Sequence, residues 1–193
     1  MSKRAQAKEA TRLRILDAAH DAFIRDGFLG LSTAEVARTA GVAHGTVFFH
    51  FESKEALLLT MLRQELGEIT ERMYERLHGS DTLAELLDTY LDELEAREPF
   101  FAMLARETPL YAPELRRSAM GYEGAVRSYF HSALSHEVLA GRCRNVDVTA
   151  ALGFLFGYLH DLLSLRDAYA EGTSVIAERR VNIARTFLTM VAT

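Results

Sequence analysis

The sequence predicts an all-α protein of about nine helices. Proline occurs only three times in 193 residues, at Pro99, Pro109 and Pro113, so few positions would break a helix. No segment keeps the alternation of apolar and polar residues that indicates a half-buried strand. Apolar residues recur instead at helical spacing along most of the chain, which is long enough and apolar enough to form one large or two small domains.

Residues 31–57 predict two short helices joined by a tight turn and followed by a third helix. Ser32 and Glu35 fit a capping box, in which the Ser32 hydroxyl accepts a hydrogen bond from the Glu35 amide and the Glu35 carboxylate returns to Ser32. Gly41 stands where a residue in the left-handed conformation commonly ends a helix. A helix of roughly two turns is therefore expected between Ser32 and Gly41.

The second helix of this segment covers residues 43–50, and Ser53 caps the third. Ala43 offers no capping side chain at the start of the second helix, and a missing N-cap costs about 1 kcal/mol. Two helices that cross at such a turn are the minimal arrangement for laying one helix into the major groove of DNA. The segment therefore favours a DNA-binding protein.

Several residue clusters between positions 10 and 60 share the spacing of one known signature. They are Ile15-Leu16, Ala18-Ala19, Phe23, Gly27-Phe28, Thr33, Val36-Ala37, Ala40-Gly41-Val42, Gly45-Thr46-Val47-Phe48-Phe49-His50-Phe51 and Ser53-Lys54-Glu55. In these positions the chain resembles TetR-type transcriptional regulators. The resemblance implies a homodimeric DNA-binding repressor with a helical ligand-binding domain.

The resemblance also implies which side chains touch DNA. The family positions that commonly contact operator phosphates match Thr33, Thr46, Phe48, His50 and Lys54, and those that face bases match His44 and Gly45. Ser32, at the start of the first helix, completes this candidate set. Many family members carry tyrosine where Phe48 and Phe49 stand, and phenylalanine has no hydroxyl to donate to a phosphate.

Charge is unevenly distributed along the chain. The formal net charge is −5, but residues 1–55 carry eight Lys/Arg against seven Asp/Glu, whereas the remainder carries 14 against 20. Five of the basic residues fall within residues 1–14, among them Lys3 and Arg4. Such a basic arm suits contact with phosphates or with the minor groove, so Lys3 and Arg4 join the candidate DNA-binding residues. The alternative is a solvated, disordered terminus.

The sequence predicts a DNA-binding domain over residues 1–53 and a second helical domain over residues 54–193. Helices of the second domain are expected at 54–78, 82–97, 100–107, 114–139, 147–170 and from 174 to near the C-terminus. The expected helix caps include Ser80 or Asp81 for the second of these helices and Thr173 or Ser174 for the last.

The last two predicted helices are candidates for joining two chains. Gly153 and Gly157 share one face of an apolar helix, where each glycine costs about 1 kcal/mol relative to alanine, which favours a close helix contact as compensation. The final helix carries an apolar stripe that includes Ile176, Ile183 and Phe187. In TetR-type proteins the last two helices form a four-helix dimer interface, so the resemblance implies the same arrangement here. The alternative is that the stripe is the core of a single chain.

The middle helices would then hold an effector. Their aromatic and sulfur-containing residues recur at helical spacing, which suits an apolar cavity but is also common in an ordinary core. Buried tyrosine hydroxyls need polar partners, which favours a ligand with one or two polar groups. We therefore expect a mainly apolar or aromatic small molecule, bound by Phe100, Met103, Leu104, Tyr111, Tyr122, Tyr129, Phe154, Tyr158 and Asp161.

No sequence motif indicates catalysis or a metal site. HExxH, CxxC and glycine-rich phosphate loops are absent from the sequence, so no catalytic residue, metal or cofactor is expected. One alternative is a small helical enzyme that uses His160 and Asp161. Another is a helical module that binds small molecules or proteins without DNA, which would leave the exposed face of residues 43–50 apolar or acidic.

The single cysteine, Cys143, excludes an internal disulfide and fits a reducing compartment. Its neighbours Arg142 and Arg144 would lower the pKa of the thiol and permit a redox switch, unless Cys143 is an incidental loop residue. The polar N-terminus lacks a signal-peptide pattern, and the longest apolar stretch, residues 150–159, is too short to span a bilayer. The sequence thus predicts a cytoplasmic protein with no membrane partner.

Together these observations predict a ligand-responsive repressor that binds a pseudo-palindromic operator in double-stranded DNA as a homodimer. An effector held between the middle helices would shift the long helix at 54–78. That shift would change the separation of the two DNA-reading helices and release the operator.

Overall fold

The computed structural model describes residues 2–78, 82–169 and 174–193, with only the backbone described for residues 76–78 and Tyr122. Across these residues the chain forms ten α-helices, one 3-10 helix and no strand, which confirms the all-α prediction. The helices are α1 (Lys3–Gly30), α2 (Thr33–Thr39), α3 (His44–His50), α4 (Lys54–His78), α5 (Leu83–Ala96), α6 (Glu98–Glu107), η1 (Thr108–Leu110), α7 (Pro113–Leu139), α8 (Val148–Ser164), α9 (Arg166–Tyr169) and α10 (Val175–Val191).

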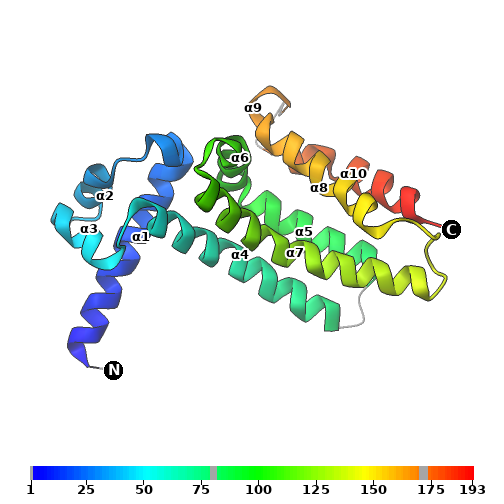
Figure 1. The fold of residues 1–193 in the computed structure, drawn as a ribbon, viewed down its shortest axis with the longest axis horizontal. Coiled ribbons are helices and arrows are strands. Elements are labelled where there is room, and N and C mark those ends of the chain that lie inside the picture. The colour runs from blue at the N-terminus through cyan, green and yellow to red at the C-terminus, as the bar shows by residue number, and fades with distance from the viewer. Residues whose placement is uncertain (1, 79–81, 170–173) are drawn as a thin grey trace.

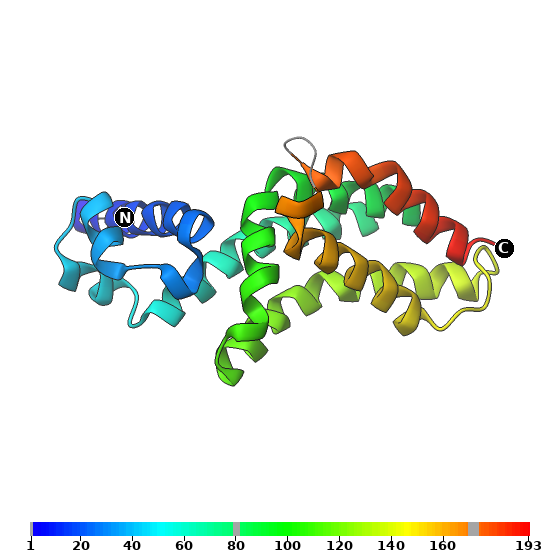
Figure 2. The ribbon, with the colours of Figure 1, turned by 90° about the horizontal axis from the view of Figure 1, so that it is seen from above.

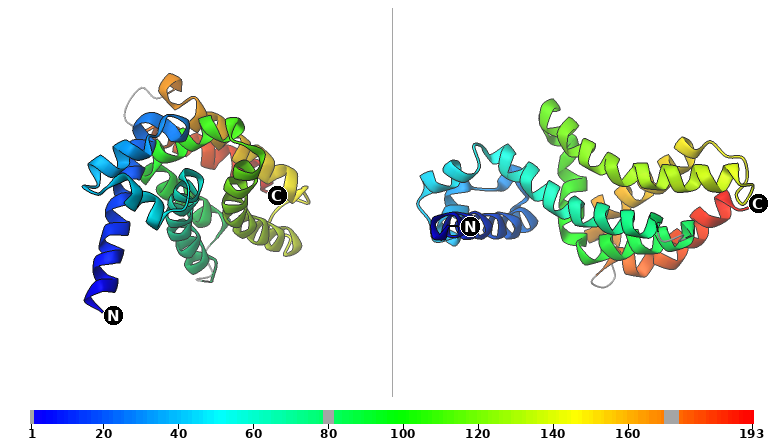
Figure 3. Two further views of the ribbon diagram at one scale, coloured as in Figure 1. Left: turned by 60° about the vertical axis from the view of Figure 1, so that its left-hand side comes forward. Right: turned by 90° about the horizontal axis from the view of Figure 1, so that it is seen from below.

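The molecule is elongated and has two parts. Figure 1 shows α1, α2 and α3 at one end, which we call the N-terminal unit, and α4 leading from it into a larger helical body formed by the helices from α4 to α10. Figure 2 shows α6 crossing between the N-terminal unit and the rest of the body. The right-hand view of Figure 3 shows α4 and α7 side by side, and their packing is the most extensive between any two helices.

The N-terminal unit is held together by residues that recur every four positions on α1. Ile15 and Phe23 are fully buried, as are Val36 of α2 and Val47 of α3. Leu58 of α4 is buried in the same core. The buried residues of α1 and α4 thus belong to one core, and α2 and α3 pack against it. Because α4 continues into the helical body, this core links the N-terminal unit to that body.

The helix predicted at 147–170 is interrupted. Leu165 leaves the helical conformation, so α8 ends at Ser164 and α9 forms separately, which gives ten helices instead of nine. The break lets Arg166 turn toward Glu98, whose carboxylate lies 2.7 Å from the Arg166 Nε. Ser174, one of the two predicted caps, begins α10, and the other, Thr173, lies outside the described residues.

Two further predicted boundaries differ at helix starts. Thr82 caps α5 through a complete capping box with Glu85, whereas the predicted caps Ser80 and Asp81 lie outside the described residues. The basic N-terminus is helical from Lys3 onward, so the region expected to form an arm is part of α1. No helix in the described ranges is long and apolar enough to cross a membrane.

Candidate functional site

The turn between α2 and α3 is built as the sequence predicts. Gly41 has a φ of 66°, in the left-handed region. The Gly41 amide donates to the carbonyl of Arg38 at 3.2 Å, and the Val42 amide donates to the carbonyl of Ala37 at 3.0 Å. These bonds close the end of α2 and turn the chain into α3.

Ser32 caps α2, but only half of the predicted capping box forms. The Ser32 hydroxyl accepts a hydrogen bond from the Glu35 amide at 3.4 Å. The Glu35 carboxylate lies instead 3.1 Å from Arg25 and 3.7 Å from Arg38, since charged partners form the stronger hydrogen bonds. As predicted, Ala43 stands at the N-cap of α3 and provides no side-chain cap.

The exposed side of α3 carries aromatic and histidine side chains. Phe48 is 43% exposed and Phe49 is 71% exposed, and His44 and Gly45 are exposed beside them. The His44 Nε2 lies 3.0 Å from Thr33 Oγ1, and the His44 ring packs edge-on against Phe48 with centroids 5.2 Å apart. This face has no acidic residue, but its two exposed phenylalanines make it partly apolar.

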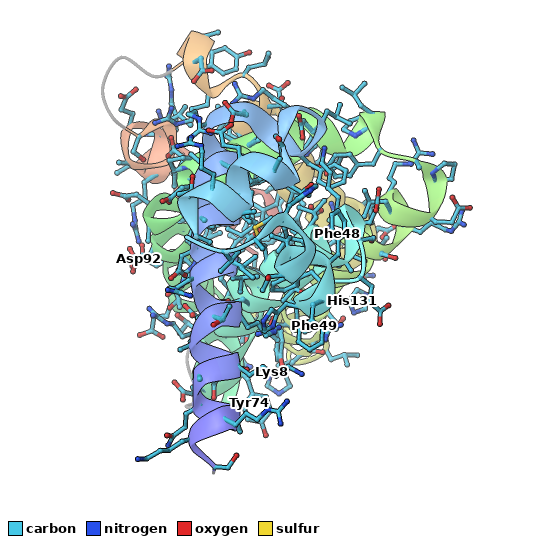
Figure 4. All side chains as sticks on the ribbon, turned by 90° about the vertical axis from the view of Figure 1, so that its left-hand side faces the viewer. Lys8, Phe48, Phe49, Tyr74, Asp92 and His131 are labelled. Carbon is cyan, nitrogen blue, oxygen red and sulfur yellow. The ribbon has the colours of Figure 1, made fainter. Side chains whose placement is uncertain are left out.

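Lys8 of α1 lies beside this face. Figure 4 shows Lys8 next to Phe49, with the ammonium nitrogen 5.1 Å from the ring centroid, a cation–π contact. His50 and Thr46 are half-buried, and His50 Nδ1 has no hydrogen-bond partner within the described part of the chain. Burial, together with the positive charges of Lys8 and Arg12, lowers the pKa of His50, so its ring is neutral near pH 7.

The remaining basic candidates divide between the surface and the junction of the two parts. Lys3 and Arg4 are exposed in the first turn of α1. Lys54 points into the junction, where its Nζ donates to the Leu29 carbonyl at 3.3 Å and lies 4.6 Å from the centroid of the Phe28 ring. The Lys54 ammonium group therefore already has two partners within the protein, the Leu29 carbonyl and the Phe28 ring.

A second candidate site is a cavity of about 480 Å³ in the helical body, bordered in part by the exposed residues Met120, Arg127 and His160. Small-molecule sites commonly range from roughly 300 to 1,000 Å³. The cavity wall is mainly apolar and comes from α4 to α8, with Leu66, Leu94, Phe101, Leu104, Phe156 and Leu163 among its residues.

Polar and charged groups also line the cavity. Burial raises the pKa of the Glu123 carboxyl on α7, against the opposing effect of Arg127 one turn away. Burial and the nearby Glu123 raise the pKa of Tyr90. The Arg127 guanidinium lies 4.6 Å from the centroid of the Phe156 ring, and Arg116 supplies a second cation. A ligand in this cavity would meet apolar walls and a few groups able to orient a polar end.

Known proteins share the arrangement of the N-terminal unit. Residues 15–61 match the sequence profile of the bacterial regulatory proteins of the tetR family. The matched residues span most of α1, the two short helices, the turn at Gly41 and the start of α4. The chain is a TetR-type transcriptional regulator.

Curated relatives of this TetR-type regulator differ in how far the similarity extends. The fatty acid metabolism regulator protein of Bacillus subtilis (strain 168) is 25% identical over 162 residues, which cover 82% of this chain and 76% of that protein. RutR, an HTH-type transcriptional regulator of Escherichia coli (strain K12), is 42% identical over 64 residues. That match covers 33% of this chain and 30% of RutR, so it concerns only a part of each protein.

Solved structures share the whole fold. The structure of FadR from Bacillus subtilis in complex with stearoyl-CoA has a TM-score of 0.80 at 20% identity and covers 92% of this chain and 97% of that chain. PfmR from Thermus thermophilus, a TetR family transcriptional regulator, has a TM-score of 0.73 at 22% identity and covers 91% and 97%. The two-part architecture is thus the TetR fold.

Most residues predicted to bind an effector of the TetR-type regulator lie away from the cavity. Among their described side chains, only that of Leu104 lines it. Phe100 and Tyr111 are buried against α1, Met103 is half-buried elsewhere on α6, and Tyr129 packs near Tyr74. Phe154, Tyr158 and Asp161 are exposed on α8, and the side chain of Tyr122 lies outside the described part of the chain.

The residues of α8 predicted to bind an effector lie on its exposed face. Phe156, Leu159 and Leu163 line the cavity at spacings of three and four residues, and Phe154 and Tyr158 repeat the same spacing on the exposed side. Because both faces of α8 are apolar, the spacing alone does not reveal which one points inward.

Sequence reasoning missed the polar residues of the cavity, although α7 carried a signal for them. Arg116, Met120, Glu123 and Arg127 follow one another at spacings of four, three and four residues, so they share one face of the helix. All four line the cavity. Arg116 and Glu123 are half-buried, whereas Met120 and Arg127 are exposed, so this face of α7 borders both the cavity and solvent.

The residues predicted to form the dimer interface fall into two groups. Gly153 and Gly157 are exposed, and apart from the backbone of α8 and the adjacent residues no atom of the described part of the chain would lie within 4 Å of a Cβ at either position. Ile176, Ile183 and Phe187 are buried inside the protomer, which corrects their assignment, since they cannot contact a second chain directly. The exposed apolar side chains of α8 and α10 are Phe154, Tyr158 and Val181.

Cys143 lacks the activated thiol that its arginine neighbours suggested. Burial and the Glu137 carboxylate raise the pKa of the thiol and outweigh the opposing effect of Arg142, which donates to Glu137 at 2.7 Å. His160 and Asp161 are both exposed on α8, and of the two only His160 lines the cavity. Within the described ranges, no group of three or more His, Cys, Asp or Glu residues is arranged to hold a metal ion.

Proposed function

We propose that this TetR-type regulator is a repressor that binds a pseudo-palindromic operator as a homodimer and is released by a small, mainly apolar effector. The proposal rests on α4, which both lines the cavity and contacts the N-terminal unit. This 25-residue helix supplies Leu66 to the cavity and begins at Lys54, which binds the Leu29 carbonyl of the N-terminal unit. A ligand that displaces Leu66 would therefore act on the orientation of that unit, provided its affinity differs between the two orientations.

The exposed face of α3 supports the DNA contact. We propose that His44 and Gly45 face bases, while Ser32, Thr33, Thr46 and the basic start of α1 contact phosphates. The solvent-exposed rings of Phe48 and Phe49 suit apolar contact with a thymine methyl or a sugar. Two copies of α3 would enter successive major grooves about 34 Å apart.

The exposed apolar face of α8 and α10 supports the dimer. Phe154 and Tyr158 are exposed on α8 close in sequence to Gly153, where the described protomer leaves open space, and Val181 is exposed on α10. We propose that a second copy packs against this face. The variant Gly153→Leu tests this, because residue 153 does not line the cavity and the added side chain has room within the protomer. Sedimentation should give monomers, and an unchanged dimer would place the interface elsewhere.

The cavity supports an effector with an acyl chain and an anionic head. Its apolar wall suits a hydrocarbon chain, and Arg116 and Arg127 suit carboxylate or phosphate groups. The similar FadR holds stearoyl-CoA in its solved structure. We therefore propose a long-chain acyl-CoA as the effector of this protein.

Selection of bound fragments from random duplex DNA is the direct test. A pseudo-palindrome should be enriched, and its affinity should fall steeply as the salt concentration rises, because phosphate contacts release counterions. If no duplex is enriched, the proposed DNA binding is wrong. Stearoyl-CoA should then release the selected duplex, whereas CoA without an acyl chain should not.

A further inference from the structure

The bend in α1 is held by a carboxylate from α6. Gly27 has non-helical backbone angles inside α1 (φ 74°, ψ 171°), which interrupt the hydrogen bonds of the helix. Glu107, the last residue of α6, accepts a hydrogen bond from the Phe28 amide at 2.6 Å, and its carboxylate also lies 3.4 Å from the Leu29 amide. This charge-assisted contact joins the N-terminal unit to the helical body.

Gly27 makes room for this contact. A Cβ built at Gly27 would overlap the Glu107 carboxylate, so any side chain at this position would displace it. The positive φ of Gly27 adds strain for every other residue. Glycine is therefore needed at this bend both for its conformation and for the approach of Glu107.

Two further contacts hold the same segment. The Tyr111 hydroxyl donates to Glu107 at 3.4 Å, and the Tyr111 ring packs edge-on against Phe28 with centroids 5.4 Å apart. From α4, Lys54 binds the Leu29 carbonyl. Phe28 and Leu29 thus lie between the end of α6 and the start of α4, in the region where Figure 1 shows α6 next to α1.

The end of α6 that carries Glu107 is also a wall of the cavity. Leu104, Ala105, Thr108 and Pro109 line it, two on each side of Glu107 in the sequence. The Thr108 hydroxyl donates to the Leu104 carbonyl at 2.7 Å, which ties this turn to α6. A shift of the turn on ligand entry would therefore move Glu107.

We propose that Glu107 is a positioning residue that couples the cavity to the DNA-binding unit by fixing the backbone of Phe28 and Leu29. The contact sets the angle of the N-terminal unit on the helical body. Occupancy of the cavity alters the contact through the turn after α6. The role of a ligand rests on the proposed function, whereas the role in orientation rests on the described contacts alone. Coupling of this kind is a free energy shared by two sites.

The orientation is tested without ligand. Spin labels at Arg38→Cys and Ser132→Cys, both exposed positions, report the distance between the two parts in a Cys143→Ser background. In Glu107→Ala the distance distribution should broaden about two-fold and the Phe28 amide should exchange at least about ten times faster, as expected when an amide loses its acceptor. Glu107→Gln keeps an acceptor and should be intermediate.

Glu114→Ala removes an exposed glutamate of α7 and serves as the matched control, in which both readouts should be unchanged. Circular dichroism identifies any variant that fails to fold, and Glu107→Gln then decides the outcome. A folded Glu107 variant with an unchanged distance distribution and unchanged exchange overturns the inference.

The coupling is tested with stearoyl-CoA as the probe. In the wild type, saturating stearoyl-CoA should weaken operator binding by at least about ten-fold, within the usual range for coupled sites. In Glu107→Ala this ratio should fall below about two-fold, while the affinity for stearoyl-CoA itself changes little. If both proteins bind stearoyl-CoA and the ratio is the same, the inference is overturned. If the wild type does not bind stearoyl-CoA, the proposed effector is wrong, and the orientation measurement decides the role of Glu107.

Discussion

Replacement of Glu98 by alanine tests what holds α10 onto the helical body. The Glu98 side chain, at the start of α6, is only 2% exposed. Its carboxylate accepts hydrogen bonds from the amides of Val175 (3.0 Å) and Ile176 (3.1 Å) and from the Ser174 hydroxyl (2.6 Å). It also pairs with Arg166 at 2.7 Å. One carboxylate thus binds the amides at the N-terminus of α10, where the helix dipole favours negative charge.

The size of the effect follows from these contacts. Removal of one partner of a buried ion pair costs about 3–5 kcal/mol, and each buried amide left without an acceptor contributes about 1–3 kcal/mol toward such a loss. We expect Glu98→Ala to lower the free energy of unfolding by about 4 kcal/mol. For a chain of this length that corresponds to a decrease in Tm of about 8–16 °C.

Urea and thermal unfolding at one fixed protein concentration measure this loss, because the stability of a dimer depends on concentration. Glu114→Ala is the control: the Glu114 side chain is 80% exposed and pairs with Arg117, so its removal should cost less than about 1 kcal/mol. If Glu98→Ala also costs less than about 1 kcal/mol, the reasoning from its hydrogen bonds is refuted.

The loss should depend on pH. Burial raises the pKa of Glu98, but the hydrogen bonds from Ser174, Ile176 and Val175 and the pairing with Arg166 together outweigh burial and lower it. A carboxyl with a lowered pKa in the folded state stabilises the protein above its unfolded pKa of about 4.3 and loses that contribution as the pH falls through the folded value. The difference between wild type and Glu98→Ala should therefore shrink below about pH 4.

Three further predictions concern single side chains. The hydrogen bond to Glu65 raises the pKa of His20 against the effect of burial, so the stability that His20 contributes should be present below its unfolded pKa of about 6.5 and lost as the pH rises through the raised value. A difference in unfolding free energy between wild type and His20→Gln that grows with pH would contradict this. The raised pKa of Cys143 should make it react with iodoacetamide at pH 7.5 more slowly than free cysteine, as measured by mass spectrometry. Phe49→Tyr restores a hydroxyl on the exposed face of α3 and should tighten operator binding by about five-fold, the equivalent of one hydrogen bond of about 1 kcal/mol. Unchanged affinity would place Phe49 away from the phosphates.

The helix-turn-helix could be predicted because its signals are local. Ser32, Gly41 and Ala43 act on amides or backbone angles within a few positions of themselves, so their residue types are sufficient to place the start of α2, the turn and the uncapped start of α3. The missing half of the capping box has a non-local cause. Arg25 of α1, ten positions before Glu35, donates a hydrogen bond to the Glu35 carboxylate.

The cavity could not be placed because residue type does not give the orientation of a helix that is apolar on all sides. Phe154 and Phe156 are both aromatic residues of α8, yet the first is 70% exposed and the second lines the cavity. Their positions depend on how α8 packs against α6, α7 and α10, which the spacing within α8 does not specify. The spacing of Arg116, Glu123 and Arg127 places them on one face of α7, but residue type alone does not show that this partly exposed face borders the cavity.

The two ends of α6 make polar contacts with residues that are distant in the sequence. The first residue of α6, Glu98, binds the amides of α10, and the last, Glu107, binds the amides after the bend in α1. Between them, Phe101 and Leu104 form part of the cavity wall. A helix of this length spans about 15 Å, so in the proposed coupling a ligand that moved its middle would act at one end on a helix of the proposed dimer face and at the other on the DNA-binding unit. Neither carboxylate could be assigned from the sequence, because their partners lie 77 and 79 positions away.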